Sequence, residues 1–270
     1  MARLATLGVD VCPHDLHLGD IARSSFGSAR FCHVFHLAAR TYVPESWLAP
    51  VDFYRTNVAG TANILELCRR VGASATVISS YVYGRPKSLP IAESHPLEAL
   101  NPYSHSKILA EEVCRYYSRT FDVKVCIVRP FNIYGPGQRE EFLVPTLVKQ
   151  ALDPRCEAIM VSDVRPRRDY IYIDDLVDLL LATFQHRVSD VFNAGSGKST
   201  SIPELVGTIC ELLGRRKPLV SCQHERREEV YEVVADISKA ITSLGWRPAV
   251  SLNVGLRRTI EWMSARHENH

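Results

Sequence analysis

The sequence of 270 residues lacks several features that would place it in familiar classes of protein. No block of like charge is sustained, and 32 Lys plus Arg against 30 Asp plus Glu give a net charge of only +2. This balance argues against nucleic acid as a partner. No apolar run approaches a membrane span, and residues 1–8 are too mixed for a signal peptide. We therefore expect a soluble cytoplasmic protein that binds neither nucleic acid nor a membrane.

Paired metal ligands are also lacking. The eight cysteines form no Cys-x-x-Cys pair and no Cys/His cluster at zinc-site spacing, so no metal site is predicted. Most of the cysteines lie in apolar runs, which is typical of buried free thiols in a reducing compartment.

A third absence concerns glycine. None of the 14 glycines forms the Gly-x-x-Gly-x-x-Gly run whose bare backbone approaches a dinucleotide pyrophosphate at a helix N-terminus. Instead, residues 3–7 have the pattern of a helix end and residues 9–12 that of a strand. We expect the chain to begin about twenty or more residues late, without the first strand and the glycine-rich loop. An intact but divergent protein is the alternative.

The order of apolar runs and helical segments in the sequence predicts an α/β fold. Short apolar runs alternate with longer helical patterns, as in a parallel sheet with crossover helices, and the runs are apolar enough to be buried on both faces. The predicted strands are 33–38, 75–79, 124–129 and 191–193, and the predicted helices are 52–71, 102–120, 174–187, 202–214 and 251–265. We predict a Rossmann-like doubly wound parallel sheet in residues 1–132, with returns near 170–196, and a smaller C-terminal lobe in 133–270.

Tyr103 and Lys107 are the main candidates for chemistry. Asn101 and Pro102 are typical of a helix cap and first turn, and the spacing of four then places Tyr103 and Lys107 on one helix face. A phenol with a pKa of about 10 is a weak base, but an ammonium within about 6 Å favours the phenolate. The spacing alone is a weak signal, and its context decides the interpretation.

That context is a series of ordered motifs. They are Val34-Phe35-His36-Leu37-Ala38-Ala39, Asn57-Val58-Ala59-Gly60-Thr61, Ser79-Ser80-Tyr81-Val82-Tyr83-Gly84, the Tyr103/Lys107 pair, 129–137 (RPFNIYGPG), 168–175 (RDYIYIDD) and 192–197 (FNAGSG). Together they resemble the extended short-chain dehydrogenase/reductase family, which contains nucleotide-sugar epimerases, dehydratases and 4-keto-reductases. The similarity runs from about Gly8 to the C-terminus.

The resemblance implies an NAD cofactor in the first domain, with NADP not excluded, and a nucleotide-diphosphate sugar bound mainly by the second lobe. It also implies a homodimer formed through helices 52–71 and 102–120. Tyr103 would carry the proton, Lys107 would lower its pKa and bind the nicotinamide ribose, and Ser79 would hydrogen-bond the sugar, with Ser80 the less favoured partner.

The resemblance assigns further residues to each ligand. The cofactor would be contacted by Asp20, Ile21, Leu37, Ala38, Ala39, Asn57 and Pro130, and the substrate by Asn132, Arg168 and Arg226. The alternatives are structural: a solvated turn for Asp20, strand-to-helix packing for the alanines and Asn57, and solvated charges for the arginines.

Residues 80 and 81 limit which reactions of this family the chain could catalyse. Related dehydratases carry an acid there, and this chain has Ser and Tyr, so water elimination lacks its general acid. Epimerisation at carbon 4 and reduction of a 4-keto-6-deoxy sugar need only Ser79, Tyr103 and Lys107. We favour epimerisation, although the short stretch between Val9 and Asp20 is more typical of the reductases. A non-catalytic relative without a cofactor site is a further alternative.

Overall fold

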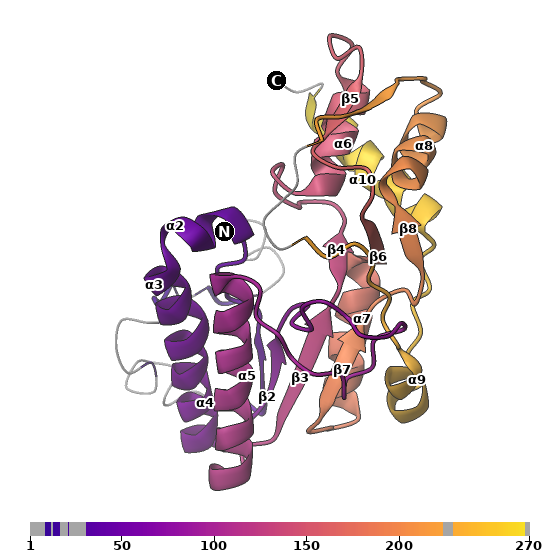
Figure 1. Cartoon of the computed structure of the whole chain (residues 1–270). Helices are drawn as coiled ribbons and strands as arrows, with labels where there is room; N and C mark the ends of the chain where they lie inside the picture. The colour runs from indigo at the N-terminus through magenta and orange to yellow at the C-terminus, as the bar shows by residue number, and fades with distance from the viewer. Residues whose placement is uncertain (1–8, 12, 17–20, 22–30, 224–228, 268–270) are drawn as a thin grey trace.

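Residues 9–11, 13–16, 21, 31–223 and 229–267 are described by a computed structural model (Figure 1). A parallel sheet covered by helices lies at one end of the molecule, and a second lobe lies beyond the carboxyl end of its strands. The elements are β1 (His33–His36), α2 (Val43–Leu48), α3 (Pro50–Phe53), η3 (Tyr54–Ala59), α4 (Gly60–Val71), β2 (Ser74–Ile78), α5 (Pro102–Phe121), β3 (Val125–Pro130), β4 (Asn132–Tyr134), α6 (Leu143–Leu152), β5 (Ile159–Val161), β6 (Arg167–Tyr172), α7 (Ile173–Gln185), β7 (Val191–Ala194), β8 (Ser199–Ser201), α8 (Ile202–Leu212), β9 (Leu219–Ser221), α9 (Ser238–Leu244) and α10 (Leu252–His267).

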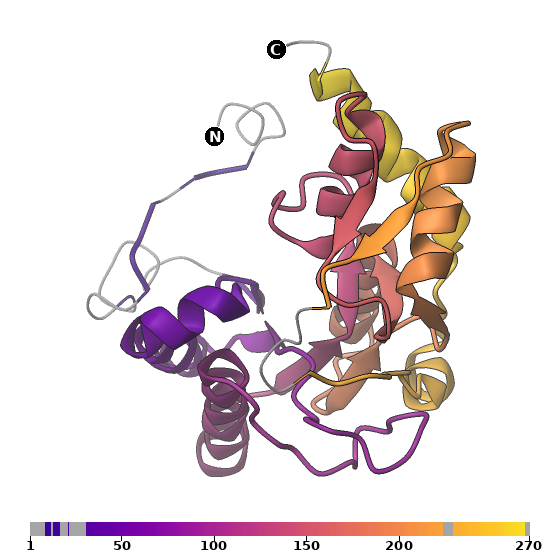
Figure 2. The same ribbon diagram turned by 45° about the horizontal axis from the view of Figure 1, so that its top comes forward.

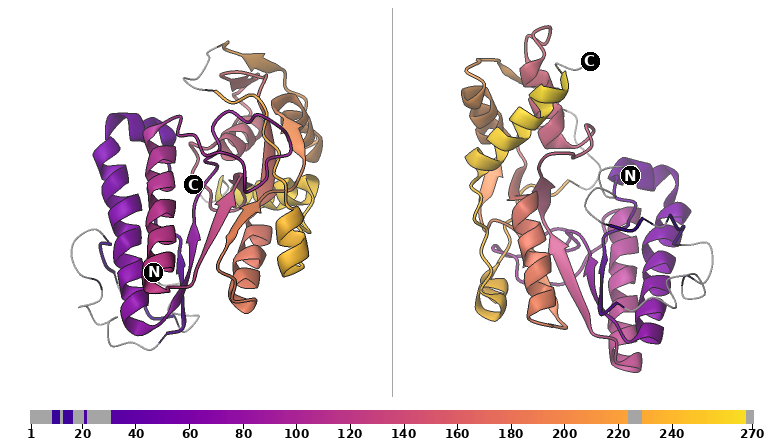
Figure 3. Two further views of the ribbon diagram at one scale, coloured as in Figure 1. Left: turned by 60° about the horizontal axis from the view of Figure 1, so that its bottom comes forward. Right: turned by 180° about the vertical axis from the view of Figure 1, so that it is seen from behind.

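The main sheet has the strand order β1-β2-β3-β7, and every neighbouring pair is parallel. Helices α4 and α5 pack on one face, and α7 packs on the other (Figure 3). Both faces are therefore covered, and all six residues of β3 are buried. The predicted doubly wound parallel sheet is confirmed, and each of its four predicted strands is found within two residues of the predicted bounds.

The long helices also lie where the sequence predicts them. The predicted helix 52–71 is less regular than expected, because residues Tyr54–Ala59 form a π-helical turn between α3 and α4. Such turns are uncommon and occur often at functional sites. This one contains Asn57, a predicted cofactor contact.

One predicted strand is wrong. Residues 9–12 were expected to form a strand, but residues 9–11 adopt no regular structure, and Cys12 lies outside the described residues. Their alternating apolar pattern has no sheet to join: Val9 is 45% exposed and Val11 40%, and β1 is hydrogen-bonded only to β2 within the described part of the chain. The predicted helix end at residues 3–7 also lies outside the described residues.

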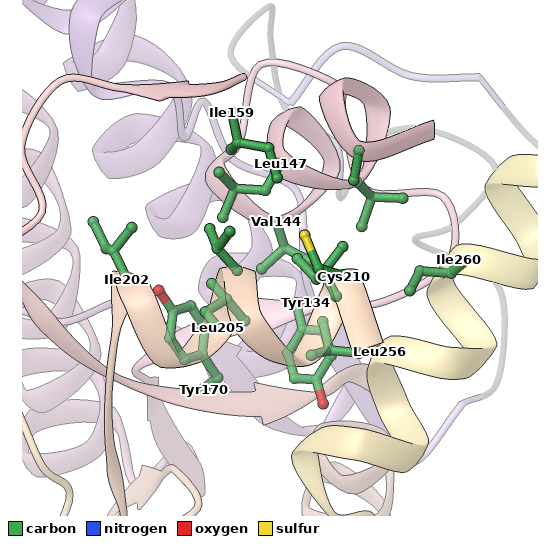
Figure 4. Close-up of a cluster of buried hydrophobic side chains, with 14 of the residues drawn as sticks. Tyr134, Val144, Leu147, Ile159, Tyr170, Ile202, Leu205, Cys210, Leu256 and Ile260 are labelled. Carbon is green, nitrogen blue, oxygen red and sulfur yellow. The ribbon is translucent and has the colours of Figure 1, made fainter. Parts of the chain in front are cut away.

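The second lobe has its own core. Helices α6, α8 and α10 enclose side chains from β4, β5 and β6 (Figure 4). Figure 2 shows this lobe, with α8 in orange and α10 in yellow, standing away from α4 and α5. The chain returns to the main sheet through α7 and β7, which pack beside β3. No helix among the described residues has the length and apolar character needed to cross a membrane.

Candidate active site

The start of α5 positions the predicted catalytic pair. The Asn101 side chain accepts a hydrogen bond from the Ser104 backbone, the Ser104 hydroxyl is placed to accept from the Asn101 backbone, and Pro102 occupies the first turn. This capping box fixes where the helix begins. Tyr103 therefore lies in the first turn and Lys107 one turn later on the same face, as the spacing predicts.

The Tyr103 ring is packed against other groups of the first domain. It lies edge-on to Phe53 of α3, with the ring centroids 6.2 Å apart. Burial is the main influence on its pKa and raises it, while the neighbouring Ser80 hydroxyl lowers it. In the absence of a nearby cation from a ligand, this phenol is therefore a weaker acid than a free tyrosine.

Lys107 is a buried cation, with 4% of its surface exposed. Its Nζ donates a hydrogen bond of 2.5 Å to the Ile78 carbonyl at the end of β2. Burial lowers the pKa of Lys107 to about 8, and the negative charge of Glu111 and the thiol of Cys114 oppose this decrease. An ammonium has three donors, so two are left to bind other groups beside Tyr103.

The two serines after β2 point to different partners. The Ser79 hydroxyl, which was expected to bind the sugar, donates a hydrogen bond of 2.6 Å to Glu111 Oε1. The Ser80 hydroxyl is buried and approaches the Tyr103 hydroxyl, but it forms no regular hydrogen bond among the described residues. A buried hydroxyl without a partner is unusual in a folded protein, so Ser80 has the free donor that the sequence interpretation assigned to Ser79.

Four residues predicted to contact a cofactor lie at the carboxyl ends of two strands of the main sheet, β1 and β3. Leu37, Ala38 and Ala39 follow β1, and Pro130 ends β3. Leu37 is 57% exposed and Ala38 is also exposed, so this end of the sheet presents small or apolar surface to a ligand. Ligands of open α/β sheets bind at this edge.

Asn57, which is predicted to contact the cofactor, forms three hydrogen bonds within the protein. Its Oδ1 accepts from the Arg40 backbone at 2.9 Å, and its Nδ2 donates to the Arg40 carbonyl and the Ser106 hydroxyl. Ser106 in turn donates to the Tyr103 carbonyl. Asn57 thus links the loop after β1 to the first turn of α5, and its Oδ1 can accept one further hydrogen bond.

The remaining two residues predicted for the cofactor lie near the N-terminus. Ile21 is buried against the α4 side of the sheet, and Asp20 lies outside the described residues. No contact in the described part of the chain therefore relates Asp20 to a ligand.

A pocket of about 160 Å³ opens beside the first turn of α5. Its wall includes Asn101 and Ser104, on either side of Tyr103, and also Asn132 and Arg168 from the second lobe. The Asn132 amide donates to the Asp169 carbonyl at 3.1 Å, and Arg168 is paired with Glu229. Two predicted substrate residues thus share one pocket with the surroundings of Tyr103, whereas Arg226 lies outside the described residues.

Several residues of this region were missed by the sequence interpretation. The most notable are Glu111 and Arg129, which form a buried ion pair with nitrogen–oxygen distances of 2.6 and 2.9 Å. Glu111 is four residues after Lys107, so its place on the same face of α5 was available as a signal. Its pairing with Arg129 on β3 depends on tertiary packing and has no local signature.

Comparison with known proteins adds independent evidence. A sequence profile for GDP-mannose 4,6 dehydratase matches residues 7–259. A Methanocaldococcus jannaschii protein provisionally named UDP-glucose 4-epimerase is 34% identical over 236 residues, 85% of this chain and 76% of the relative. GDP-6-deoxy-D-mannose reductase of Pseudomonas aeruginosa is 30% identical over 247 residues, 87% of this chain and 81% of the relative. The structure of UDP-glucuronic acid 4-epimerase from Bacillus cereus with UDP-glucuronic acid and NAD superimposes with a TM-score of 0.88 at 25% identity, covering 98% of this chain and 86% of the other.

Proposed function

The chain belongs to the extended short-chain dehydrogenase/reductase family of nucleotide-sugar enzymes, and on this basis we propose that it is an NAD-dependent epimerase acting at carbon 4 of a nucleotide-diphosphate sugar. The observation that carries the proposal is the group formed by Ser80, Tyr103 and Lys107. The buried Ser80 hydroxyl lies beside the Tyr103 phenol, Lys107 follows one helical turn later, and residues on either side of Tyr103 line a pocket.

The described residues fit the nicotinamide half of the cofactor. Lys107 has two donors free for a ribose, and the small residues Ala38 and Ala39 leave the end of β1 open for a flat ring system. When bound, NAD would supply reversible hydride transfer at carbon 4, so that return of the hydride to the other face of the sugar gives the 4-epimer. The sequence does not distinguish NAD from NADP, and NADP remains compatible with these residues.

Side chains of the protein would carry out the proton transfer. Ser80 would donate a hydrogen bond to the sugar oxygen at carbon 4, and Tyr103 would accept the proton of that hydroxyl as it is oxidised. Burial raises the pKa of Tyr103, and we propose that the Lys107 ammonium, one helical turn away, stabilises the phenolate by its charge when the ligands are bound. For the return step Tyr103 would give the proton back, so the same three residues serve both directions.

The substrate would extend from this group into the pocket. Arg168 is suited to a diphosphate because its guanidinium offers a fork of donors to phosphate oxygens. To bind, the diphosphate would replace Glu229 as the partner of Arg168. We also propose that the chain forms a homodimer through α4 and α5.

Dehydration is disfavoured by the residues at positions 80 and 81. Positions 80 and 81 carry hydroxyls, and the Tyr81 hydroxyl donates to the Gly84 carbonyl at 2.7 Å. The two carboxylates that line the pocket, Glu98 and Glu229, are at other positions of the chain. The positions that carry the acid in the related dehydratases therefore hold no carboxylate here.

Reduction of a 4-keto-6-deoxy nucleotide sugar is the second candidate, and the 30% identity to the GDP-6-deoxy-D-mannose reductase favours it. The two reactions differ in their need for a cofactor. We expect the purified chain to carry oxidised NAD and to interconvert 4-epimers of UDP-, GDP- or dTDP-hexoses with no reduced cofactor added. Strict dependence on added NADPH or NADH would establish the reductase, and failure to bind either dinucleotide at micromolar concentration would indicate the non-catalytic relative.

Variants at the three residues test the assignment of roles. Tyr103→Phe removes the proton carrier and should lower kcat by at least about a thousandfold. Ser80→Ala should lower kcat by about ten- to a hundredfold, whereas Ser79→Ala, whose hydroxyl faces Glu111, should be milder. A larger loss for Ser79→Ala than for Ser80→Ala would restore Ser79 as the residue that contacts the sugar.

A further inference from the structure

A buried carboxylate with no place in the proton transfer lies directly behind the active-site group. Glu111 is on α5, two turns after Tyr103, and is only 1% exposed. Oε1 accepts hydrogen bonds from Ser79 Oγ at 2.6 Å and Arg129 Nε at 2.9 Å, and Oε2 accepts from Arg129 and Arg115, both at 2.6 Å. Four donors converge on one carboxylate, so no lone pair faces the pocket.

We propose that Glu111 is a positioning residue, which holds the Ser79-Ser80 turn by the Ser79 hydroxyl so that the Ser80 hydroxyl is directed at Tyr103. The proposal rests on the proposed function for the reaction that Ser80 serves, but the contacts of Glu111 stand independently of it. Glu111 would touch neither substrate nor cofactor and would act only through Ser79 and through its charge.

The geometry of the strand end supports this role. The Ser79 backbone donates to the Val128 carbonyl, so it continues the β2–β3 ladder beyond Ile78. Ser80 follows Ser79 directly, and the residues that the two serines meet, Glu111 and Tyr103, are both on α5. Fixing Ser79 by its backbone to β3 and by its hydroxyl to Glu111 therefore restricts the position of Ser80 beside Tyr103.

Arg129 holds the Glu111 carboxylate in a fixed position. Its guanidinium binds both oxygens of Glu111 and also donates to the Tyr83 hydroxyl and the Glu93 carbonyl, each at 3.0 Å. Burial raises the pKa of Glu111, but the hydrogen bonds and charge of Arg129, with Ser79 and Arg115, outweigh burial and hold it below the usual value. Glu111 is thus an anion at every pH at which the protein works.

The same charge acts on Lys107, one turn earlier on α5. Three titratable groups act on or respond to the Lys107 ammonium: Cys114 and Glu111 from α5, and His36 from β1. The pKa of His36 is lowered to about 4 by burial and by the charge of Lys107, so His36 is neutral near pH 7. Glu111 is therefore the anion that supports the charged form of Lys107.

The test uses Glu111→Gln and Ser79→Ala, with Glu112→Gln as the matched control. Glu112 is the next residue of α5, also pairs with Arg115, but is 63% exposed and faces away from the site. Ser79→Ala keeps the Glu111–Arg129 pair and removes only the hydrogen bond from Ser79 to Glu111. It therefore remains informative if Glu111→Gln fails to fold. Each variant is measured for kcat and KM with its best nucleotide sugar, and the pKa of Lys107 is followed by NMR of labelled lysine, assigned with Lys107→Arg.

Glu111→Gln should lower kcat about tenfold or more, with KM nearly unchanged, and should move the Lys107 titration down by about one pH unit. Ser79→Ala should lower kcat about fivefold with no change in that titration, and Ser79→Thr should restore kcat because it keeps the hydroxyl. Glu112→Gln should match the wild type in both measurements. Reduced stability with unchanged kcat and an unmoved Lys107 titration would show that Glu111 is merely structural and would overturn the proposal.

The outcomes also separate this proposal from the proposed function. If the wild-type chain turns over no nucleotide sugar but Glu111→Gln still moves the Lys107 titration, the proposed reaction fails and the electrostatic contact stands. If the wild-type chain epimerises and neither Glu111→Gln nor Ser79→Ala affects kcat, the positioning role fails and the reaction stands.

Discussion

Replacing Lys107 by Met should make the protein more stable at neutral pH while abolishing its activity. Lys107 is 4% exposed, and burial lowers its pKa to about 8 from the ordinary value of 10.5. A lowered lysine pKa means that the folded state disfavours the ammonium relative to the unfolded state. Methionine has a similar length and shape and carries no charge to desolvate.

The magnitude follows from the two pKa values. A difference of 2.5 between 10.5 and 8 corresponds to about 3 kcal/mol of unfolding free energy lost to the charged lysine. Methionine also removes the hydrogen bond to the Ile78 carbonyl, which costs about 1 kcal/mol. The net stabilisation by Lys107→Met is therefore about 2 kcal/mol at pH 7.

The pH dependence has a definite sign. Below pH 8 lysine is charged in both states, so its whole penalty is present. As the pH rises from about 8 toward 10.5 the folded lysine loses its proton first and the penalty disappears. The unfolding free energy of Lys107→Met should therefore exceed that of the wild type by about 2 kcal/mol at pH 7 and by about zero at pH 9.5.

Urea unfolding of wild type and Lys107→Met at both pH values measures this directly. Lys149→Met is the control, because Lys149 is half-exposed and paired with Glu140, and it should change stability by no more than about 0.5 kcal/mol. A destabilised Lys107→Met at pH 7, or a difference that does not depend on pH, would refute the assignment of Lys107 as a desolvated cation.

Two further substitutions test the packing around the site. Arg129→Met leaves the Glu111 carboxylate buried without its main partner and should cost about 3–5 kcal/mol by urea unfolding; a cost below about 1 kcal/mol would mean that Arg129 is not the principal counter-charge. Gly255→Ala places a Cβ 2.2 Å from Tyr134 Oη and should cost about 1–3 kcal/mol. Gly207→Ala meets nothing within 4 Å on α8 and should be neutral or slightly stabilising, so equal effects of the two glycine variants would contradict the packing of α10.

The regular parts of the fold could be predicted because their signals are local. The apolar runs of β2 and β3 and the cap before α5 specify element type and start without knowledge of the neighbours. The strands β4, β5, β8 and β9 escaped prediction because three residues give little periodicity, and β6 because it begins with the charged residues Arg167, Arg168 and Asp169 rather than an apolar run. Residues 9–11 show the opposite error, since a strand-like pattern has no paired neighbour in the described sheet.

For the candidate active site, the types of residue could be predicted from the sequence, but the directions of their side chains could not. The spacing of Tyr103 and Lys107 on one helix face needs only helical geometry. Which of two adjacent serines faces Tyr103 depends on Glu111, and the availability of Asn57 depends on Arg40 and Ser106. These side-chain orientations depend on contacts between residues that are far apart in the sequence, so a local sequence motif cannot predict them.

The proposed reaction has one direct test, the fate of a deuterium at carbon 4. A nucleotide hexose labelled there is incubated with the purified chain without added reduced cofactor, with Tyr103→Phe as the inactive control. The deuterium should remain at carbon 4 in both epimers, because the hydride leaves and returns within one active site. Loss of the label to solvent, or no interconversion unless NADPH or NADH is supplied, would contradict it.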